Sequence, residues 1–278
     1  MKMDSKNITL LEKMRSIRFS KVNTFLLLLI LYSIAVALYN IDNIANILIH
    51  FLSLLILSII GLSIEKFLLK KTPKINTFLI SIIIIFLLLH YLPYSLEIFT
   101  IHLLTIIGLF LVKTIRFHNN PIMNPVAFSL IFTGLIVYLI PSIDFVFISW
   151  WGASFAGIIG TLILLPVILY VGYAFKKFPT IIAFILTLGL IIIVNQELLE
   201  QILSLLFFVG VMLIEIKTSP IKIKEQIIYG IGGAILVLYI PSILNIDNQI
   251  LALAGINLLY FSYREVKLYL KKKKNVSN

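Results

Sequence analysis

The chain has 278 residues, of which 60% are hydrophobic and 13% are charged, and its formal net charge is +11. This composition is typical of a membrane domain and excludes an ordinary soluble domain. The chain contains no cysteine, which excludes disulfides, thiolate-bound iron–sulfur clusters and cysteine nucleophiles. Its four histidines lack the spacing of metal ligands, so we predict no metal site.

Ten apolar stretches follow one another along the chain, and a transmembrane helix needs about 20 apolar residues. We therefore predict an all-α, polytopic membrane protein with about ten transmembrane helices. Residues 1–20 are predicted to form a basic cytoplasmic arm, 21–264 the membrane domain and 265–278 a basic cytoplasmic tail. The predicted spans are Asn23–Tyr39, Ile44–Leu62, Ile75–Tyr91, Ile98–Lys113, Pro125–Ile140, Gly152–Phe175, Pro179–Val194, Gln201–Ile216, Gln226–Ile240 and Gln249–Phe261.

All Lys and Arg residues fall in the two termini and in alternate connections between the stretches, and the five intervening connections contain none. Basic residues are retained on the cytoplasmic side of an inserted helix. We therefore place both termini in the cytoplasm and the chain in the cytoplasmic membrane of a prokaryote. Because the charge reports topology, we expect no nucleic-acid binding, but the basic ends favour anionic lipids.

The connection before the fifth stretch contains two Asn-Pro pairs, Asn120-Pro121 and Asn124-Pro125, four residues apart. Asparagine favours the helix N-cap and proline the first helical position, so either pair could start a helix. The free N–H groups of such a helix end attract anions and polar substrate groups. Asn120 and Asn124 are therefore candidates for a substrate or ion path. The alternative is a well-capped helix with an interfacial loop.

A second polar segment runs from Glu215 to Pro220. Glu215 lies at the inner end of the eighth stretch, where an acid is costly unless it is paired or hydrated. Lys217 is close enough in sequence to pair with it, and Ser219-Pro220 repeats the pattern of a helix start. Glu215, Thr218 and Ser219 are therefore candidates for the same path. The alternative is an interfacial acid that reaches water.

The second and fourth stretches contain His50 and His102. Because the pKa of histidine lies near neutrality, His102 is a candidate for proton handling, and a histidine hydrogen-bonded between helices is the alternative. Trp150 and Trp151 border the outer side, where indole rings suit the membrane interface. We find no phosphate-binding glycine loop and no Ser/His/Asp arrangement.

A weak internal similarity links the fifth and ninth stretches. An Asn-Pro-Ile or Ser-Pro-Ile sequence precedes each, an Ile-Pro-Ser-Ile sequence follows each, and Gly134 and Gly233 fall at matching places. Both stretches are predicted to run from inside to outside. The similarity is either a remnant of duplication or a chance match in Ile-rich sequence.

Several of these segments resemble the RnfD family, which are membrane subunits of the Rnf electron-transport complex and of the sodium-translocating NADH:quinone reductase. The run Asn120–Phe128 resembles the family's "NPFNPA" segment, and Ser149-Trp150-Trp151-Gly152 before a Gly/Ala-rich helix is also similar. The segment Glu215–Pro220, followed by Tyr229-Gly230, resembles the family's "TDPVT" and "IYG" sequences, with Glu215 in place of the Asp and Thr218 as the second Thr. The similarity covers roughly residues 20 to 265 and implies ten helices with both ends cytoplasmic.

The chain departs from this family in one outer loop. Family members carry a Ser/Thr-x-ATPL sequence there, whose threonine holds a covalently attached flavin mononucleotide. Here residues 141–149 take its place, and no such sequence occurs in the chain. This argues against covalent flavin and describes a shortened form of the family. A noncovalent flavin stacked on Trp150 or Trp151 is the alternative.

The sequence thus predicts an integral membrane subunit resembling RnfD, within a redox-driven electron-transport complex that translocates Na⁺ or H⁺. Other membrane subunits would be its partners, since this chain supplies no recognised redox centre, and it would be at most a non-catalytic subunit of an ion-translocating oxidoreductase. The alternative is a stand-alone channel or transporter for a small solute, such as a flavin precursor or a urea-like amide. A structural or assembly protein is a third interpretation.

Overall fold

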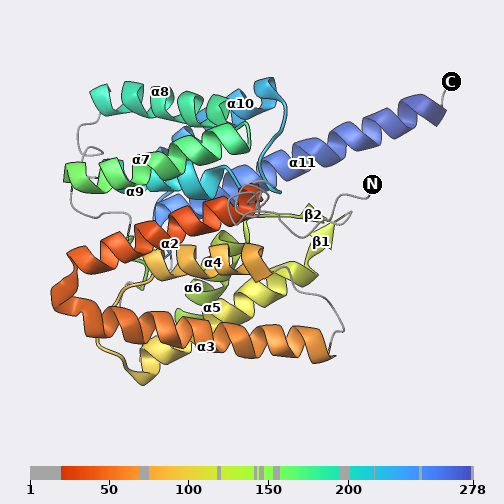
Figure 1. Ribbon diagram of the computed structural model, residues 1–278. Coiled ribbons are helices and arrows are strands. Elements are labelled where there is room, and N and C mark those ends of the chain that lie inside the picture. Colours follow the sequence, from red (N-terminus) through yellow and green to blue (C-terminus); the bar gives the residue numbers. More distant parts are fainter. Residues whose placement is uncertain are drawn as a thin grey trace, which may run out of the picture.

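The computed structural model describes residues 20–68, 75–117, 120–140, 143, 147–152, 157–194, 201–215, 217–243 and 246–276. Within these residues each predicted stretch contains one α-helix, so the all-α prediction is confirmed (Figure 1). A 3₁₀ turn η1 (Ile41–Asn43) and a two-residue antiparallel ladder of β1 (Arg116–Phe117) and β2 (Asn120–Pro121) complete the described elements. The helices are α2 (Lys21–Tyr39), α3 (Ile44–Leu68), α4 (Ile75–Leu88), α5 (Leu96–Thr114), α6 (Pro125–Val137), α7 (Gly157–Ala174), α8 (Phe178–Val194), α9 (Ile202–Phe207) continued by the π-helical η3 (Phe208–Leu213), α10 (Ile223–Tyr239) and α11 (Asn248–Val276).

Several helix ends differ from the sequence prediction, and two of them, in α4 and α11, have a visible physical reason. α4 ends at Leu88 and not at Tyr91, because the next residues pair with a distant segment: the His90 N–H donates to Phe147 O at 2.9 Å. α11 does not end near Phe261 but continues to Val276, through the predicted boundary between residues 264 and 265. The added turns are rich in Lys, Leu and Tyr, and Lys and Leu are good helix formers whether or not the segment is apolar. The predicted basic arm, apart from Ser20, lies outside the described residues.

Of the two Asn-Pro pairs and the Ser-Pro pair, only one starts a helix. The second Asn-Pro pair starts α6, with the Asn124 side chain accepting from the N–H groups of Val126 and Ala127. The first pair forms β2. The helix start predicted at Ser219-Pro220 is wrong, since α10 begins at Ile223, because the Ser219 hydroxyl donates backwards to Glu215 O and leaves the following N–H groups uncapped.

The helices pack as two groups, α2–α6 and α7–α11, with the same pattern of neighbours in each. α2 packs on α4, α3 on α5, and α5 on α6; correspondingly, α7 packs on α9 and η3, α8 on α10, and α10 on α11. The groups meet where α2 contacts α7 and where α6 contacts α11. Because successive helices alternate in direction and each group has an odd number of helices, the second group is inverted relative to the first. This is the arrangement of an inverted repeat.

The packing pattern does not match the internal similarity between the fifth and ninth stretches. α6, the fifth, corresponds by its neighbours to α11, whereas α10, the ninth, corresponds to α5. α6 and α10 also run in the same direction, whereas counterparts in an inverted repeat run in opposite directions. The repeated Pro-Ile and Ile-Pro-Ser-Ile sequences are therefore unrelated to the repeat in the fold.

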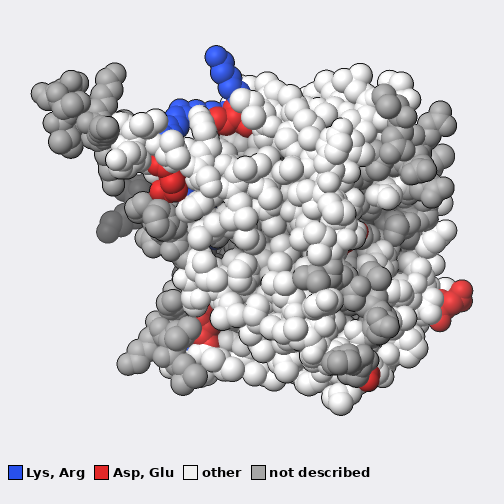
Figure 2. Space-filling model, turned by 180° about the vertical axis from the view of Figure 1, so that it is seen from behind, with Lys and Arg blue, Asp and Glu red and all other residues white. Residues whose placement is uncertain are grey.

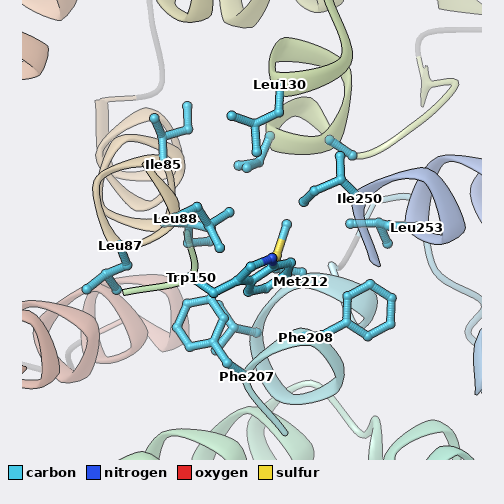
Figure 3. Close-up of a cluster of buried hydrophobic side chains, with 14 of the residues drawn as sticks. Ile85, Leu87, Leu88, Leu130, Trp150, Phe207, Phe208, Met212, Ile250 and Leu253 are labelled. Atoms are coloured by element: carbon cyan, nitrogen blue, oxygen red, sulfur yellow. The ribbon is translucent and has the colours of Figure 1, made fainter. Parts of the chain in front are cut away.

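A cluster of apolar side chains fills the middle of the molecule, where the two groups meet (Figure 3). It brings together Ile85 and Leu88 from α4, Leu130 from α6, and Met212 from η3, all buried. Phe207, Phe208, Ile250, Leu253 and the indole of Trp150 complete the cluster. The buried core thus lies on the helices next to the interface between the groups, α4, α6, α9–η3 and α11.

The outer surface of the described residues is strongly apolar. Large side chains such as Leu38, Ile56, Leu162 and Leu190 are more than half exposed, and they belong to four different helices. Figure 2 shows one face on which the middle is almost free of charge, with acidic and basic residues near its margins. Among the described residues, two helices are long and apolar enough to cross a membrane, Lys21–Tyr39 and Ile41–Phe67. The apolar helices Ile75–Leu88, Leu96–Val112, Pro125–Val137, Ile159–Ala174, Phe178–Ile193 and Ile202–Leu213 are shorter.

Candidate functional site

The starts of α2, α4 and α6 and the ends of α7 and η3, which adjoin connections that carry Lys or Arg, come together at one end of the bundle, here called the basic end. The Lys21 ammonium at the start of α2 donates to Ala174 O at the end of α7, at 2.8 Å. The starts of α2 and α4 are joined by a 2.7 Å hydrogen bond from Asn76 to Asn23. The ladder β1–β2 and the projecting part of α11 lie on this side in Figure 1.

Near the first turns of α10, Glu225 pairs with Lys267 of α11 at 2.7 Å. The hydrogen bond from Lys267 lowers the pKa of Glu225 and raises the pKa of Lys267. This exposed pair links α10 to the part of α11 that extends beyond the bundle.

A cavity of about 350 Å³ lies at the basic end and is called the basic-end cavity below. Its walls come from the starts of α2, α4 and α6, the end of α7, and η3 with the turn that follows it. Most of the wall is apolar, and its polar groups come from Thr77, Ser81, Asn124, Glu215 and Lys217. Two of the predicted site residues, Asn124 and Glu215, therefore face one cavity although they are far apart in sequence.

Asn124 joins two elements at this cavity. Its side-chain oxygen caps α6, and its Nδ2 donates to Met212 O of η3 at 3.1 Å. A π-helical turn is a rare, wide turn that often occurs at functional sites, and this one leaves Met212 O available to a distant side chain. Asn124 is 4% exposed, so both roles are carried by a buried amide.

Glu215 follows directly after the end of η3. The Thr218 hydroxyl donates to Glu215 Oε2 at 2.7 Å, and the N–H and hydroxyl of Ser219 both donate to Glu215 O. Thr218 and Ser219, also predicted for this site, thus hold the turn and the carboxylate in place. The second carboxylate oxygen remains the main acceptor that Glu215 brings to the cavity wall.

Lys177 is a site residue that the sequence did not indicate. It is 2% exposed, and its ammonium donates to Pro220 O at 2.7 Å and to Ser219 O at 3.4 Å. Burial lowers the pKa of Lys177 to about 8, and the negative charge of Glu215 opposes this shift. Lys176 adopts φ 56° in the tight turn between α7 and α8, and this turn directs its neighbour inward. In the sequence, Lys177 is one of two adjacent lysines in a basic connection, and nothing there distinguishes the buried one.

His102 belongs to a separate hydrogen-bonded group between α3 and α5. Its Nδ1 lies 2.9 Å from Ser53 Oγ, which lies 2.7 Å from the hydroxyl of the partly exposed Tyr94. The ring of His50 is 4.9 Å from that of His102, and His50 Nε2 lies 2.7 Å from Leu92 O. This group is a hydrogen-bonded chain from the surface to His102, and none of its members lines the basic-end cavity.

Trp150 and Trp151, the predicted flavin-stacking residues, lie at the opposite end. Both are buried: Trp150 packs on Phe207, and Trp151 packs on Phe86 and Tyr91 while its indole donates to Phe86 O at 2.7 Å. Flavin stacking stays a prediction. The side chain of Asn120 lies outside the described residues, although its backbone belongs to β2.

Asp247 gives the opposite end a counterpart of Asn124, because it precedes α11 as Asn124 precedes α6. Its Oδ1 accepts from the Gln249 N–H at 2.8 Å. Burial raises the pKa of Asp247, while the hydrogen bonds that it accepts and the nearby Trp150 indole oppose this. The two ends still differ, because the central apolar cluster with Trp150 fills the space on this side.

Comparisons with models of known protein families and with curated proteins found no match to this chain. Within the described residues, no three His, Asp or Glu side chains come together as a set of metal ligands. The basic end thus combines a largely apolar cavity with a half-buried carboxylate, a buried amide and, beside the cavity, a buried ammonium.

Proposed function

We propose that this chain is a multi-pass subunit of a prokaryotic cytoplasmic membrane, resembling RnfD, in a redox-driven complex that translocates Na⁺ or H⁺. The observation that carries the proposal is Glu215, a carboxylate on the wall of a cavity within an apolar helix bundle. Acids in such positions are rare and mark ion or substrate paths. Asn124, Glu215, Thr218 and Ser219 are the residues that would contact the ion.

The membrane location is supported by the apolar surface and the distribution of charge. Side chains such as Leu38, Ile56 and Leu190 are more than half exposed, on helices that carry charges near their ends. Soluble monomers rarely expose apolar patches of more than a few hundred Å². The shorter helices, for example α6 and α8, fit a bilayer that is thin or locally deformed, or half-helices that border a cavity.

The need for partners is supported by the filled centre of the bundle. Ile85, Leu130 and Met212 belong to the apolar cluster that fills the centre of the bundle (Figure 3), and none of the three lines the basic-end cavity. Ion movement then requires a change of conformation, and a redox partner is the source of free energy in the proposed complex. Anionic lipids are expected at the basic end, where Lys and Arg are concentrated.

A stand-alone transporter for a small solute is the second candidate, and the cavity volume of about 350 Å³ favours it. Ligand pockets start near this size and combine apolar walls with a few polar groups. The basic-end cavity has this character through Asn124 and Glu215. The two candidates differ in whether the chain acts alone or with redox subunits.

The test uses inside-out vesicles from native membranes, energised with NADH, and follows the uptake of ²²Na⁺ and of protons. Glu215→Gln removes a charge whose charge-assisted contacts are worth about 1.4 kcal/mol or more, so uptake should fall by about tenfold or more. Glu97→Gln is the matched control, since Glu97 is a partly exposed acid at the opposite end, in the first turn of α5, and should leave uptake unchanged.

Two results would refute the redox proposal. One is full NADH-driven uptake in the Glu215→Gln vesicles. The other is purification of the wild-type chain from native membranes, in mild detergent, without any flavin-bearing redox subunit. Solute movement in liposomes that contain this chain alone would establish the transporter instead.

A further inference from the structure

A monovalent cation is already bound next to Glu215, in the form of the Lys177 ammonium. Pro220 O accepts from Lys177 Nζ at 2.7 Å and Ser219 O at 3.4 Å, in the turn that begins at Glu215. Glu215 begins the same turn, and its negative charge favours the Lys177 ammonium although the two side chains form no direct ion pair. Backbone carbonyls at a point where a helix is unwound are the ligands that many transporters use to bind Na⁺.

Further oxygen atoms surround this position. Gln226 donates from Nε2 to Lys176 O and to Ile221 O, which places it between the neighbours of Lys177 and of Pro220. Its Oε1 is buried and has no hydrogen-bond partner, and the same holds for the hydroxyls of Tyr229 and Thr180. Buried oxygens without a donor are costly, so an ion or water that coordinates them would stabilise the site.

We propose that the turn Glu215–Pro220 is a Na⁺ site and that the Lys177 ammonium is its tethered occupant, which an incoming Na⁺ displaces. The ligands would be Glu215, Thr218 Oγ1 and the carbonyls of Ser219 and Pro220. The Na⁺ site rests on the proposed function, because Na⁺ would be the ion that the complex translocates. Binding of Na⁺ to the site needs no redox partner.

The exchange conserves charge at the site. One positive charge leaves the turn as another arrives, so the negative charge of Glu215 always has a positive charge near it, and an uncompensated charge is the costly state. Lys177 is suited to this because its head is a compact ammonium on a flexible four-carbon stem, while its backbone N–H is fixed to Gly172 O at 2.8 Å. The route for Na⁺ is the basic-end cavity, whose wall includes Glu215.

Binding of ²²Na⁺ to the purified full-length chain in lipid nanodiscs, at pH 7.5 and constant ionic strength, tests the proposal. Lys177→Gln removes the competing ammonium, so Na⁺ should bind at least about tenfold more tightly than to the wild type. Lys224→Gln removes an exposed lysine from the same end and should leave the affinity unchanged. Adding Glu215→Gln to Lys177→Gln should abolish the gain.

A second measurement uses the wild-type protein, so misfolding of a variant cannot affect it. NaCl, compared with choline chloride, should increase the modification of Lys177 by a small amine reagent, read by peptide mass spectrometry, and leave Lys224 unaffected. Either of two results would overturn the proposal. One is an unchanged Na⁺ affinity in a folded Lys177→Gln protein, and the other is a yield of Lys177 modification that does not change with Na⁺.

The outcomes separate this inference from the redox function. Tight Na⁺ binding to Lys177→Gln, together with purification free of redox subunits, would support the site and refute the complex. NADH-driven uptake in native vesicles, together with an unchanged affinity in Lys177→Gln, would support the complex and refute the site.

Discussion

At the scale of single residues, the basic end uses the same polar groups for stability and for the candidate site. Asn124 caps α6 and holds η3 through Met212 O. Glu215 holds the turn to Ser219 through its carbonyl and faces the cavity through its carboxylate. A variant at either position changes packing as well as binding, so a control of folding must accompany every functional test of these residues.

The lowered pKa of Lys177 makes the free energy of unfolding depend on pH. Its pKa is about 8 in the folded protein and 10.5 in the unfolded chain, so the unfolded chain binds more protons between these values. Stability should therefore rise with pH from about 8 toward 10, and the full effect of this one group is about 3 kcal/mol. Below pH 8 the whole cost of the buried ammonium is present in the folded state.

The measurement is the thermal unfolding midpoint in detergent at several pH values from 7 to 9.5. The wild type should gain stability over this range relative to Lys177→Met, which has no group that titrates there. Parallel pH profiles for the two proteins would contradict the assignment of a buried, titrating Lys177.

At the scale of elements, the contact between α8 and α10 depends on glycine. A Cβ at Gly230 would lie 2.5 Å from Thr180 O, a backbone atom that cannot move aside alone. Close contacts between membrane helices commonly use such small residues. The position therefore sets how near α10 can approach the start of α8, and with it the position of Lys177.

Gly230→Ala should destabilise the protein, because α8 and α10 must separate to admit the methyl group, at a cost of about 1–3 kcal/mol. Gly189→Ala is the matched control, since nothing lies within 4 Å of a Cβ there. That change should be neutral or stabilising by up to about 1 kcal/mol, as alanine favours helices. Thermal midpoints of the two variants decide this, and equal values would refute the close approach at Gly230.

At the scale of the whole molecule, the two inverted groups of helices give two ends that are not equivalent. The basic end has a cavity, whereas at the other end Trp150 packs on Phe207 within the central cluster. The segment that carries Trp150 is held to the end of α4, where the Ser149 N–H donates to Leu88 O. It joins the two groups and has no counterpart in the repeat, which explains the difference between the ends.

The orientation of the molecule can be tested directly, because the chain has no cysteine of its own. We expect a membrane-impermeant maleimide to label Asp42→Cys in intact cells, and to label Lys224→Cys only after the cells are permeabilised. Both positions are exposed and lie at opposite ends of the bundle. Labelling of Lys224→Cys in intact cells would contradict the predicted topology, because it would place the basic end outside the cell.

The helix content could be predicted from the sequence because it depends on local properties. Apolar stretches of helical length, separated by polar connections, each contain a helix, and the Asn124-Pro125 pair marks the start of α6. Hydropathy and capping act within a few residues, so they can be read along the chain.

The candidate site depends on contacts between segments far apart in sequence, and only part of it could be predicted. Glu215 and Asn124 could be singled out because an acid at the end of an apolar stretch and a repeated Asn-Pro pair are unusual in themselves. Lys177 could not be, because only the packing of α8 against α10 and the turn after η3 separates it from Lys176. Local hydropathy thus specifies the helices and their order along the chain. Which polar groups share one cavity is set by the packing of those helices, because burial and pairing depend on neighbours that are distant in sequence.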